Sequence, residues 1–338
     1  MLKKVNAITV LSFGKKEITV MAVDSATDKV LRRKSIACNF DVLNNAGAIA
    51  NPPLMASFLR NVFQENEFPK QVKVSLNLKY LDLRRLSFPE MPLTELHSVV
   101  MDEAVRESIF SYAGEAVSVA YLLLKNQSGE AGLNREVLAA TTPQAIIDSI
   151  VASFAGTKLK LISIQPSLVG LGRVLKRYLR LTAGKPVILL YLYPEEAELY
   201  IWEGQAPLFW RYISVGSSDM ERLQNEIRTS LEHFKNRFTS HVNVITVMGE
   251  EAALNFGDQF EISYLPVDKR ADLFGLGIMD KEEYPFTFVR PSAKLQLLLQ
   301  FPALSKYWPA ALGLLLLVNI WMGWDLWTRS RYLLSAAM

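Results

Sequence analysis

The stretch from Tyr307 to Trp324 limits the possible folds of this chain more than any other feature. Its eighteen residues contain no charged side chain. A helix rises about 1.5 Å per residue, so the stretch covers about 27 Å, close to the roughly 30 Å hydrocarbon core of a bilayer. A buried core helix explains the Leu-rich centre but not the aromatic ends, so the sequence predicts one membrane-spanning helix at residues 307–327. Its expected interfacial anchors are Tyr307, Trp308, Trp321, Trp324 and Trp327.

The flanking sequence predicts which side of the membrane carries most of the chain. The first residues include two lysines but no long apolar run, so they do not resemble a secretory signal. Cys38 is the single cysteine, which fits a reducing compartment. We therefore expect a cytoplasmic domain at residues 1–290 and a linker at 291–306 before the span. The tail at 328–338 is either a short far-side end or the start of a longer chain, and both alternatives stay open.

Composition excludes several classes of function. The chain has 338 residues, with 37 basic and 34 acidic side chains and a formal net charge of +3. So balanced a charge gives no electrostatic basis for binding nucleic acid. The histidines His97, His233 and His241 are dispersed and have no cysteine partner at ligand spacing, so the sequence predicts no metal site.

Before the apolar stretch, strand and helix patterns alternate as in an α/β protein. A second series of aromatic and β-branched strands begins at Val187. A capping box from Ser218 to Glu221 is expected to start the helix that follows this series. The apolar face of that helix is expected to consist of Leu223, Ile227, Leu231 and Phe234. The first series is expected to contain strands at 5–11, 18–23 and 30–36, a helix at 54–66 and a strand at 72–78.

Two pairs of glycines have different expected roles. Gly170 and Gly172 lie inside a helical pattern at 167–178, which favours close helix packing over phosphate binding. Gly275 and Gly277 predict a loop near the end of the domain.

The segment at residues 84–110 has a distinct pattern, RRLSFPEMPLTELHSVVMDEAVRESIF. Pro89 and Pro92 are expected to end a strand, and Thr94 to cap the helix that follows. The apolar face of this helix is expected to consist of Leu96, Val99, Val100 and Ala104.

Three acids, Asp102, Glu103 and Glu107, lie on the other side of the same helix. A solvated helix face explains them better than a catalytic pair does, because nothing nearby in the sequence supplies burial or a nucleophile.

The 84–110 pattern resembles a segment of the PilM family of type IV pilus assembly proteins. There, an Arg-rich strand, a Pro-x-Met turn and a helix with a Glu-Ala pair, here Glu103-Ala104, open an inserted subdomain. The run from Val187 to Arg237 is similar to the second half of the same proteins. The linker and span resemble those of the GspL proteins of type II secretion, which carry a divergent form of this domain. The resemblance covers about residues 5–280 for the fold and the remainder for the layout.

The resemblance implies an actin-like fold of two related lobes, in the superfold that actin shares with sugar kinases. It implies an inserted subdomain at about 82–158 and a second lobe at about 184–280. In the family, the partners are a hexameric assembly ATPase and a short N-terminal segment of a second bitopic protein of the PilN or GspM type. The inserted subdomain contributes to the partner surface there, which makes Asp102, Glu103 and Glu107 candidate contacts. A homodimer or higher oligomer is also implied.

Nucleotide-binding members of this superfold use three backbone-rich turns. Two facing Asp-x-Gly hairpins hold metal and phosphate, and a Gly-Gly turn lies beneath the adenosine. Magnesium and phosphate need carboxylates and close backbone N–H groups. In this chain the three turns fall on Ser12-Phe13-Gly14, Tyr191-Leu192-Tyr193 and Gly249-Glu250-Glu251. The comparison therefore predicts a fold that keeps the turns, has lost the nucleotide chemistry and uses no cofactor.

We expect a bitopic inner-membrane scaffold of a type IV pilus or type II secretion machine, without enzymatic activity. The sequence leaves open which of the two systems it serves. One alternative is a working ATPase or small-molecule kinase of the same superfold, which intact Asp-x-Gly turns would have favoured. Another is a membrane-tethered filament protein related to FtsA. It is a poorer fit, because FtsA uses a peripheral amphipathic helix where this chain has a full span.

The expected topology can be tested with reporter fusions. Alkaline phosphatase should be active when fused after residue 338 and inactive when fused near residue 290, because it needs the oxidising far side to form its disulfides. An active fusion near residue 290 would contradict the predicted orientation.

Overall fold

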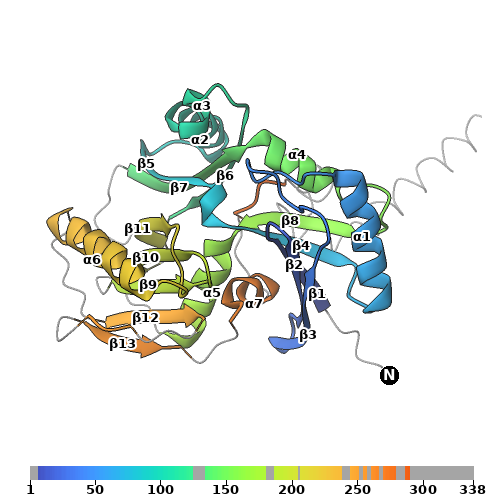
Figure 1. The fold of residues 1–338 in the computed structure, drawn as a ribbon. Coiled ribbons are helices and arrows are strands. Elements are labelled where there is room, and N and C mark those ends of the chain that lie inside the picture. The colour runs from blue at the N-terminus through green and yellow to red at the C-terminus, as the bar shows by residue number, and fades with distance from the viewer. Residues whose placement is uncertain are drawn as a thin grey trace, which may run out of the picture. The chain divides into compact units, whose positions relative to one another are not determined.

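The computed structural model describes residues 7–124, 134–179, 186–204, 206–237, 244–250, 254–256, 260–265, 269–278 and 286–289. The chain divides into two compact units, Met1–Val289 and Arg290–Met338, and every described residue belongs to the first. In this described part the strands form two five-stranded sheets and one three-stranded sheet (Figure 1).

The first sheet begins as an antiparallel meander and ends with parallel strands, in the order β3-β2-β1-β4-β8. β2 is buried from Ile18 to Val23 because helices cover both faces of the sheet, whereas the edge strand β3 is exposed along almost its whole length. The side chain of Asn51 caps α1 by accepting the Leu54 N–H at 3.0 Å. The elements of this first lobe are β1 (Ala7–Phe13), β2 (Glu17–Asp24), β3 (Lys29–Ala37), α1 (Pro52–Glu65), β4 (Gln71–Leu76), α4 (Gln144–Ala152) and β8 (Lys160–Pro166).

The second lobe repeats this topology. Its sheet has the order β11-β10-β9-β12-β13, again a meander followed by two parallel strands. The helix α6 covers the outer face, and the predicted apolar face is confirmed, since Leu223, Ile227, Leu231 and Phe234 are all buried. The elements are β9 (Val187–Leu192), β10 (Ala197–Glu203), β11 (Ala206–Ile213), α6 (Met220–Arg237), β12 (Val244–Gly249) and β13 (Glu261–Tyr264).

A third sheet, of order β5-β7-β6, is inserted into the first lobe between β4 and α4. A short 3-10 helix, η1 (Leu78–Tyr80), leads into it from β4. α2 packs on this sheet over a small core of Phe88, Leu96, Val100 and Val137. The elements of the inserted part, which occupy residues 82–143, are β5 (Asp82–Pro89), α2 (Leu93–Glu107), α3 (Ile109–Tyr112), β6 (Val117–Leu123) and β7 (Asn134–Pro143).

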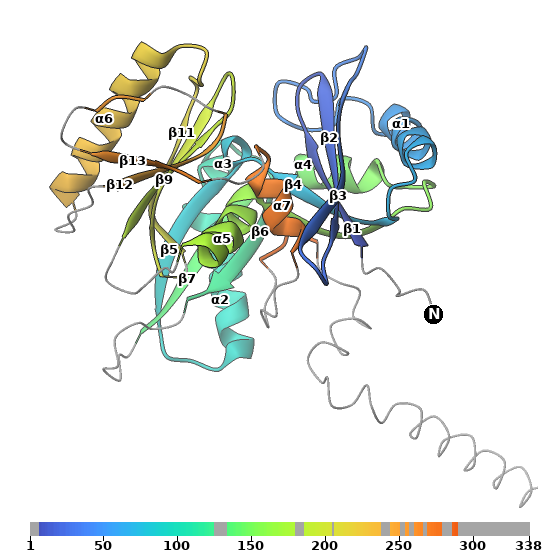
Figure 2. The same ribbon diagram turned by 90° about the horizontal axis from the view of Figure 1, so that it is seen from below.

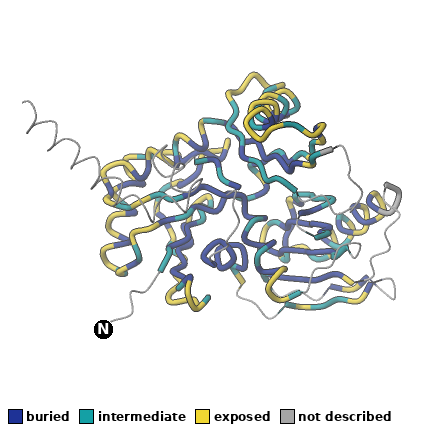
Figure 3. The backbone as a smooth tube through the Cα atoms, turned by 180° about the vertical axis from the view of Figure 1, so that it is seen from behind, coloured by how far each residue is buried: buried dark blue, intermediate teal, exposed yellow. Residues whose placement is uncertain are grey.

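Two helices, α5 (Ser167–Tyr178) and α7 (Ala271–Gly277), lie between the two larger sheets (Figure 2). They touch backbone to backbone. A Cβ atom on Gly170 would lie 2.0 Å from the carbonyl oxygen of Asp272, and one on Gly275 would lie 1.9 Å from the carbonyl oxygen of Gly170. The predicted packing role of Gly170 is thus confirmed. The buried backbone, dark blue in Figure 3, runs through both larger sheets and these helices.

The prediction of a loop around Gly275 and Gly277 is wrong, because both glycines lie in α7. Glycine is a poor helix former in isolation, but here its missing side chain permits the close contact with α5, and tertiary packing outweighs propensity.

Two predicted helix caps also differ from the structure. α2 begins at Leu93 directly after Pro92, so Thr94 lies inside the first turn, and no side chain caps the helix. α6 begins one residue later than the capping box implies. The Asp219 carboxylate, and not the Ser218 hydroxyl, accepts a backbone N–H of its first turn, that of Arg222 at 3.2 Å.

Val99, predicted on the apolar face of α2, is exposed because it lies at the margin of that face.

Within the described ranges, no helix has the length and apolar character that crossing a bilayer requires. The predicted linker at 291–306, the span at 307–327 with its five aromatic anchors, and the tail at 328–338 lie outside the described residues.

Candidate functional site

The first of the three predicted turns is a tight hairpin between β1 and β2. Gly14 donates its N–H to the Glu17 carbonyl at 2.9 Å, so this group is already used inside the turn. Ser12 pairs in register with Ser75 of β4. Lys15 and Lys16 extend into solvent, and their carbonyls accept backbone N–H groups from the chain that follows β3.

The second turn joins β9 to β10 and is packed with aromatic rings. Tyr191 is fully buried, and its ring lies edge-on to that of Tyr193 with the centroids 4.7 Å apart. Tyr193 donates its N–H to Glu196 at 2.9 Å and accepts the N–H of Ser217 at 3.0 Å. Aromatic side chains and internal hydrogen bonds therefore fill this turn.

The third turn ends β12, next to the second. Gly249 has a φ of +95°, and a Cβ atom there would lie 2.2 Å from the Leu192 carbonyl. Glu250 donates its N–H to the same carbonyl at 3.0 Å, and its carboxylate lies 2.7 Å from the Lys269 ammonium. The fold thus brings the second and third turns together through Leu192. Glu251 lies outside the described residues.

A buried carboxylate, Asp272 at the start of α7, connects the two lobes. Arg270 contacts both of its oxygens at 3.1 Å. Tyr191 of the second lobe donates its hydroxyl at 2.7 Å, and Ser75 of the first lobe donates its own at 3.2 Å. We call Asp272, Arg270, Tyr191 and Ser75 the interlobe network, and we include in it the buried Glu198 of β10, which is described below.

Charge pairing inside this network sets its protonation. Burial pushes the pKa of Asp272 upward, but the charge of Arg270 and the hydrogen bonds from Arg270 and Tyr191 outweigh burial and hold that pKa below its ordinary value. Burial and the Asp272 charge raise the pKa of Tyr191 well above its ordinary value. Asp272 is therefore ionised and Tyr191 neutral at physiological pH, which suits a structural ion pair with a hydroxyl donor.

Glu198 of β10 makes the second connection between the lobes. Its carboxyl group is fully buried and accepts the N–H of Leu78 in the first lobe at 3.1 Å. Tyr200 donates to it at 2.9 Å, and the Ser167 hydroxyl at the start of α5 lies 3.4 Å from both oxygens. Burial raises the pKa of Glu198 to about 7, although the bonds from Tyr200 and Leu78 act in the opposite direction.

A third polar contact extends this seam toward the surface. Glu196 accepts from the side-chain amide of Asn77 in the first lobe at 3.0 Å and from the Tyr212 hydroxyl at 2.7 Å. Sequence reasoning missed Glu196, Glu198 and Asp272 as site residues. The sequence does mark Glu198, because this charged residue stands among the apolar and aromatic residues of a predicted strand.

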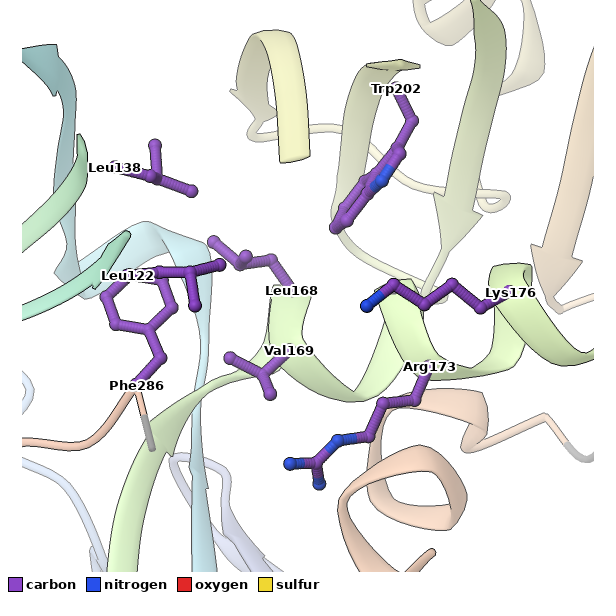
Figure 4. Close-up of a pocket in the computed structure, with 9 residues that line it drawn as sticks. Leu122, Leu138, Leu168, Val169, Arg173, Lys176, Trp202 and Phe286 are labelled. Atoms are coloured by element: carbon purple, nitrogen blue, oxygen red, sulfur yellow. The ribbon is translucent and has the colours of Figure 1, made fainter. Parts of the chain in front are cut away.

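A small groove lies where the inserted sheet, α5 and the second lobe meet (Figure 4). Its volume is about 20 Å³, room for about one water molecule. Trp202 of β10 is buried there, and among the described residues its indole N–H has no hydrogen-bond partner. Figure 4 shows the apolar side chains on one side and Trp202, Arg173 and Lys176 on the other. The lining residues are Leu122, Leu138, Leu168, Val169, Gly172, Arg173, Lys176, Trp202 and Phe286.

The three acids predicted as partner contacts lie on α2, far along the chain from the interlobe network. Asp102 is exposed, whereas Glu103 and Glu107 both pair with Arg106 of the same helix. Apolar side chains are exposed beside them at the end of α2 and in α3. These are Val105, Ile109 and Tyr112, with exposed fractions of 37%, 52% and 74%.

The described part of the chain holds no group of three His, Cys, Asp or Glu side chains close enough to bind a metal ion. His97 instead pairs with the Tyr121 hydroxyl at 2.9 Å.

Comparisons with known proteins identify the fold. No protein-family model matches the sequence, and no curated protein matches it. Among solved structures, a chain of the PilM–PilN type IV pilus biogenesis complex aligns with a TM-score of 0.59 and 18% identity, covering 72% of this chain and 81% of that one. The cytoplasmic domain of EpsL, an inner-membrane component of the type II secretion system of Vibrio cholerae, aligns with a TM-score of 0.52 and 9% identity, covering 85% and 99%.

These neighbours belong to the two groups that the sequence resembles, and at such identities they show the fold alone. Together with the repeated strand order of the two lobes, they confirm the predicted α/β, actin-like, two-lobed fold.

The raised pKa of Glu198 predicts a pH-dependent stability. Between its ordinary value of 4.5 and about 7, the unfolded chain loses this proton while the folded chain keeps it, so stability falls as pH rises through that window. The loss amounts to roughly 3 kcal/mol. Glu198→Gln keeps an acceptor for Leu78 and a donor for Ser167 but does not ionise. The variant should therefore melt at a higher temperature than the unaltered protein at pH 8 and at a similar temperature at pH 5.

Glu196→Gln is the matched control, because Glu196 is only partly buried and both of its partners are donors. It should not melt above the unaltered protein at pH 8. A Glu198→Gln protein that melts below the unaltered protein at pH 8 would show that the ionised carboxylate stabilises the fold.

Proposed function

We propose that this protein is a non-catalytic scaffold of a type IV pilus or type II secretion machine. One observation carries the proposal: the second of the three turns is filled by Tyr191 and Tyr193, and the Tyr191 hydroxyl is bonded to the buried Asp272. This filling occurs in a fold shared with a chain of the PilM–PilN complex and with the EpsL cytoplasmic domain. The family resemblance supports the biological setting, and the filled second turn is the argument against nucleotide chemistry.

The side-chain chemistry around the turns supports a lost nucleotide site. Magnesium needs carboxylate or water oxygens with free lone pairs, and phosphate needs unoccupied N–H groups. Asp272 is already committed to Arg270, Tyr191 and Ser75, and the N–H groups of Gly14 and Tyr193 bond within their own turns. A bound nucleotide would have to displace these contacts.

The proposed partners are proteins. The first is a PilN-like or GspM-like bitopic protein, by analogy with the PilM–PilN complex, and the second is a hexameric assembly ATPase, by analogy with the family. The acidic face of α2 and the exposed side chains of Val105, Ile109 and Tyr112 offer both charged and apolar groups, as protein interfaces do. A homodimer or higher oligomer belongs to the same proposal.

The span at 307–327 would tether the domain to the inner membrane, with residues 1–290 in the cytoplasm.

The ATPase alternative keeps one argument, the two lysines beside Gly14, since Lys15 and Lys16 are exposed and could attract phosphate. Exposed lysines beside a turn whose Gly14 N–H is already bonded hold phosphate weakly, however.

The proposal predicts no tight binding of ATP. Calorimetry with residues 1–290 and magnesium-ATP should detect no binding with a Kd below about 10 μM, which corresponds to roughly −7 kcal/mol. That affinity is too high for two solvated lysines. A tighter Kd that Lys15→Ala/Lys16→Ala abolishes would favour the ATPase alternative.

The proposal also predicts a partner surface on α2. Reversing the charge of Asp102, Glu103 and Glu107 to lysine should weaken capture of the assembly ATPase or of the second bitopic protein by tenfold or more. The melting temperature should change little, because exposed pairs such as those with Arg106 contribute about 0–1 kcal/mol.

A matched triple reversal on other elements, at the exposed acids Glu65, Glu195 and Glu232, should leave capture unchanged. If both triple variants capture partners equally well, the partner surface is not the acidic face of α2.

A further inference from the structure

The strand β3 forms an open edge of the first sheet. Among the described residues it pairs with β2 on one side and with no strand on the other (Figure 1). Every residue of β3 except Ile36 is exposed. Half of the backbone N–H and C=O groups of an edge strand point away from its neighbour, so β3 offers a row of donors and acceptors to one more strand.

A bulge limits the part of this edge that another strand can follow. The pairing with β2 shifts between Val30 and Arg32, which leaves Leu31 without an opposite residue. A bulge bends its strand and interrupts the ladder of hydrogen bonds. The regular part of the edge is therefore residues 32–37, which extend over about 20 Å. We call residues 32–37 the basic edge.

The basic edge begins with three consecutive cations, Arg32, Arg33 and Lys34. Successive side chains of a strand point to opposite faces, so Arg32 and Lys34 lie on one face of the sheet and Arg33 on the other. The contacts of the first pair agree with this placement. Arg32 donates to the Asn66 carbonyl, and Lys34 donates to the side-chain oxygen of Asn66 at 2.9 Å.

The contacts of Arg32 and Lys34 hold these side chains in place without cancelling their charge. Asn66 is the residue at which α1 ends, and both of its acceptor oxygens are neutral. The Arg32 guanidinium also lies over the Phe68 ring, 5.9 Å from its centroid. A cation that is already ordered loses little side-chain entropy when it pairs with a carboxylate.

The charge and the two-sided arrangement together select the chemistry of a ligand. Three cations favour a ligand that carries negative charge. A flat anionic surface that lies against one face of the sheet reaches the cations of that face alone. An added strand with consecutive acidic residues reaches both faces, because its own side chains alternate, and it also bonds to the outward backbone groups.

We propose that the basic edge is a docking site for an extended acidic segment of a partner protein, which adds to the first sheet as a further strand. Its acidic side chains lie beside Arg32 and Lys34 on one face and beside Arg33 on the other. The proposal rests on the scaffold function, and it adds a second partner surface at the opposite edge of the first sheet from β8.

The test uses the full chain in detergent and a fluorescent synthetic peptide of sequence TVTEEEVTV. Anisotropy should show saturable binding. Arg32→Glu/Lys34→Glu should weaken this binding at least tenfold, because attraction becomes repulsion at two positions. The matched control is Arg222→Glu/Arg228→Glu at exposed positions of α6, which should bind the peptide as the unaltered protein does. Equal binding by all three proteins would overturn the proposal.

A second peptide separates strand addition from charge attraction alone. It has the same sequence with its backbone amides methylated, so it keeps its charges but donates no main-chain hydrogen bond. It should bind at least tenfold more weakly than the unmodified peptide. Equal binding of the two peptides would contradict strand addition.

Hydrogen exchange of the unaltered protein gives a readout that needs no variant. When the peptide is saturating, the amides of the basic edge that point away from β2 should exchange at least tenfold more slowly. Unchanged exchange would overturn the proposal. If phosphatidylglycerol in mixed micelles slows these amides and the peptide does not, the edge serves a lipid surface and the proposal also fails. Either failure leaves the α2 capture experiment untouched, so the two proposals can be judged separately.

Discussion

The junction of the two lobes depends on one buried ion pair, Arg270–Asp272. A carboxylate that is 1% exposed is tolerated only when charge and hydrogen bonds replace the lost water. Arg270 supplies the charge, while Tyr191 and Ser75 supply a hydroxyl from each lobe. Removing any one of these partners would leave part of the carboxylate unsatisfied inside the core. The ion pair therefore requires α7, β4 and β9 to keep one relative position.

This internal bridge changes what an actin-like fold can do. In the nucleotide-binding members, as the family resemblance implies, two facing hairpins hold metal and phosphate. Here Asp272 and Glu198 connect the lobes through side chains of the same chain, and the backbones of α5 and α7 are in direct contact. A junction closed by its own residues favours a rigid platform over a hinge, because interlobe motion would expose buried polar groups.

Local patterns predicted most elements, whereas contacts between distant residues could not be read from the sequence. The strands of both meanders and the buried face of α6 follow from periodicity and β-propensity. The helix α7 was missed because its glycines argue against a helix until the contact with Gly170 is known. Glu198 and Asp272 were missed because their partners Leu78 and Ser75 lie 120 and 197 residues away in the sequence. The burial of Tyr191 is consistent with its place in an apolar, β-branched strand pattern.

The exposed strand β3 has a consequence at high protein concentration. An open strand edge is a template on which a second copy can add its own edge, and repeated addition leads to fibres. β3 carries Lys29, Arg32, Arg33 and Lys34 along this edge, so two copies approaching edge to edge would bring eight positive charges together. This repulsion protects the first lobe from uncontrolled polymerisation without covering the strand.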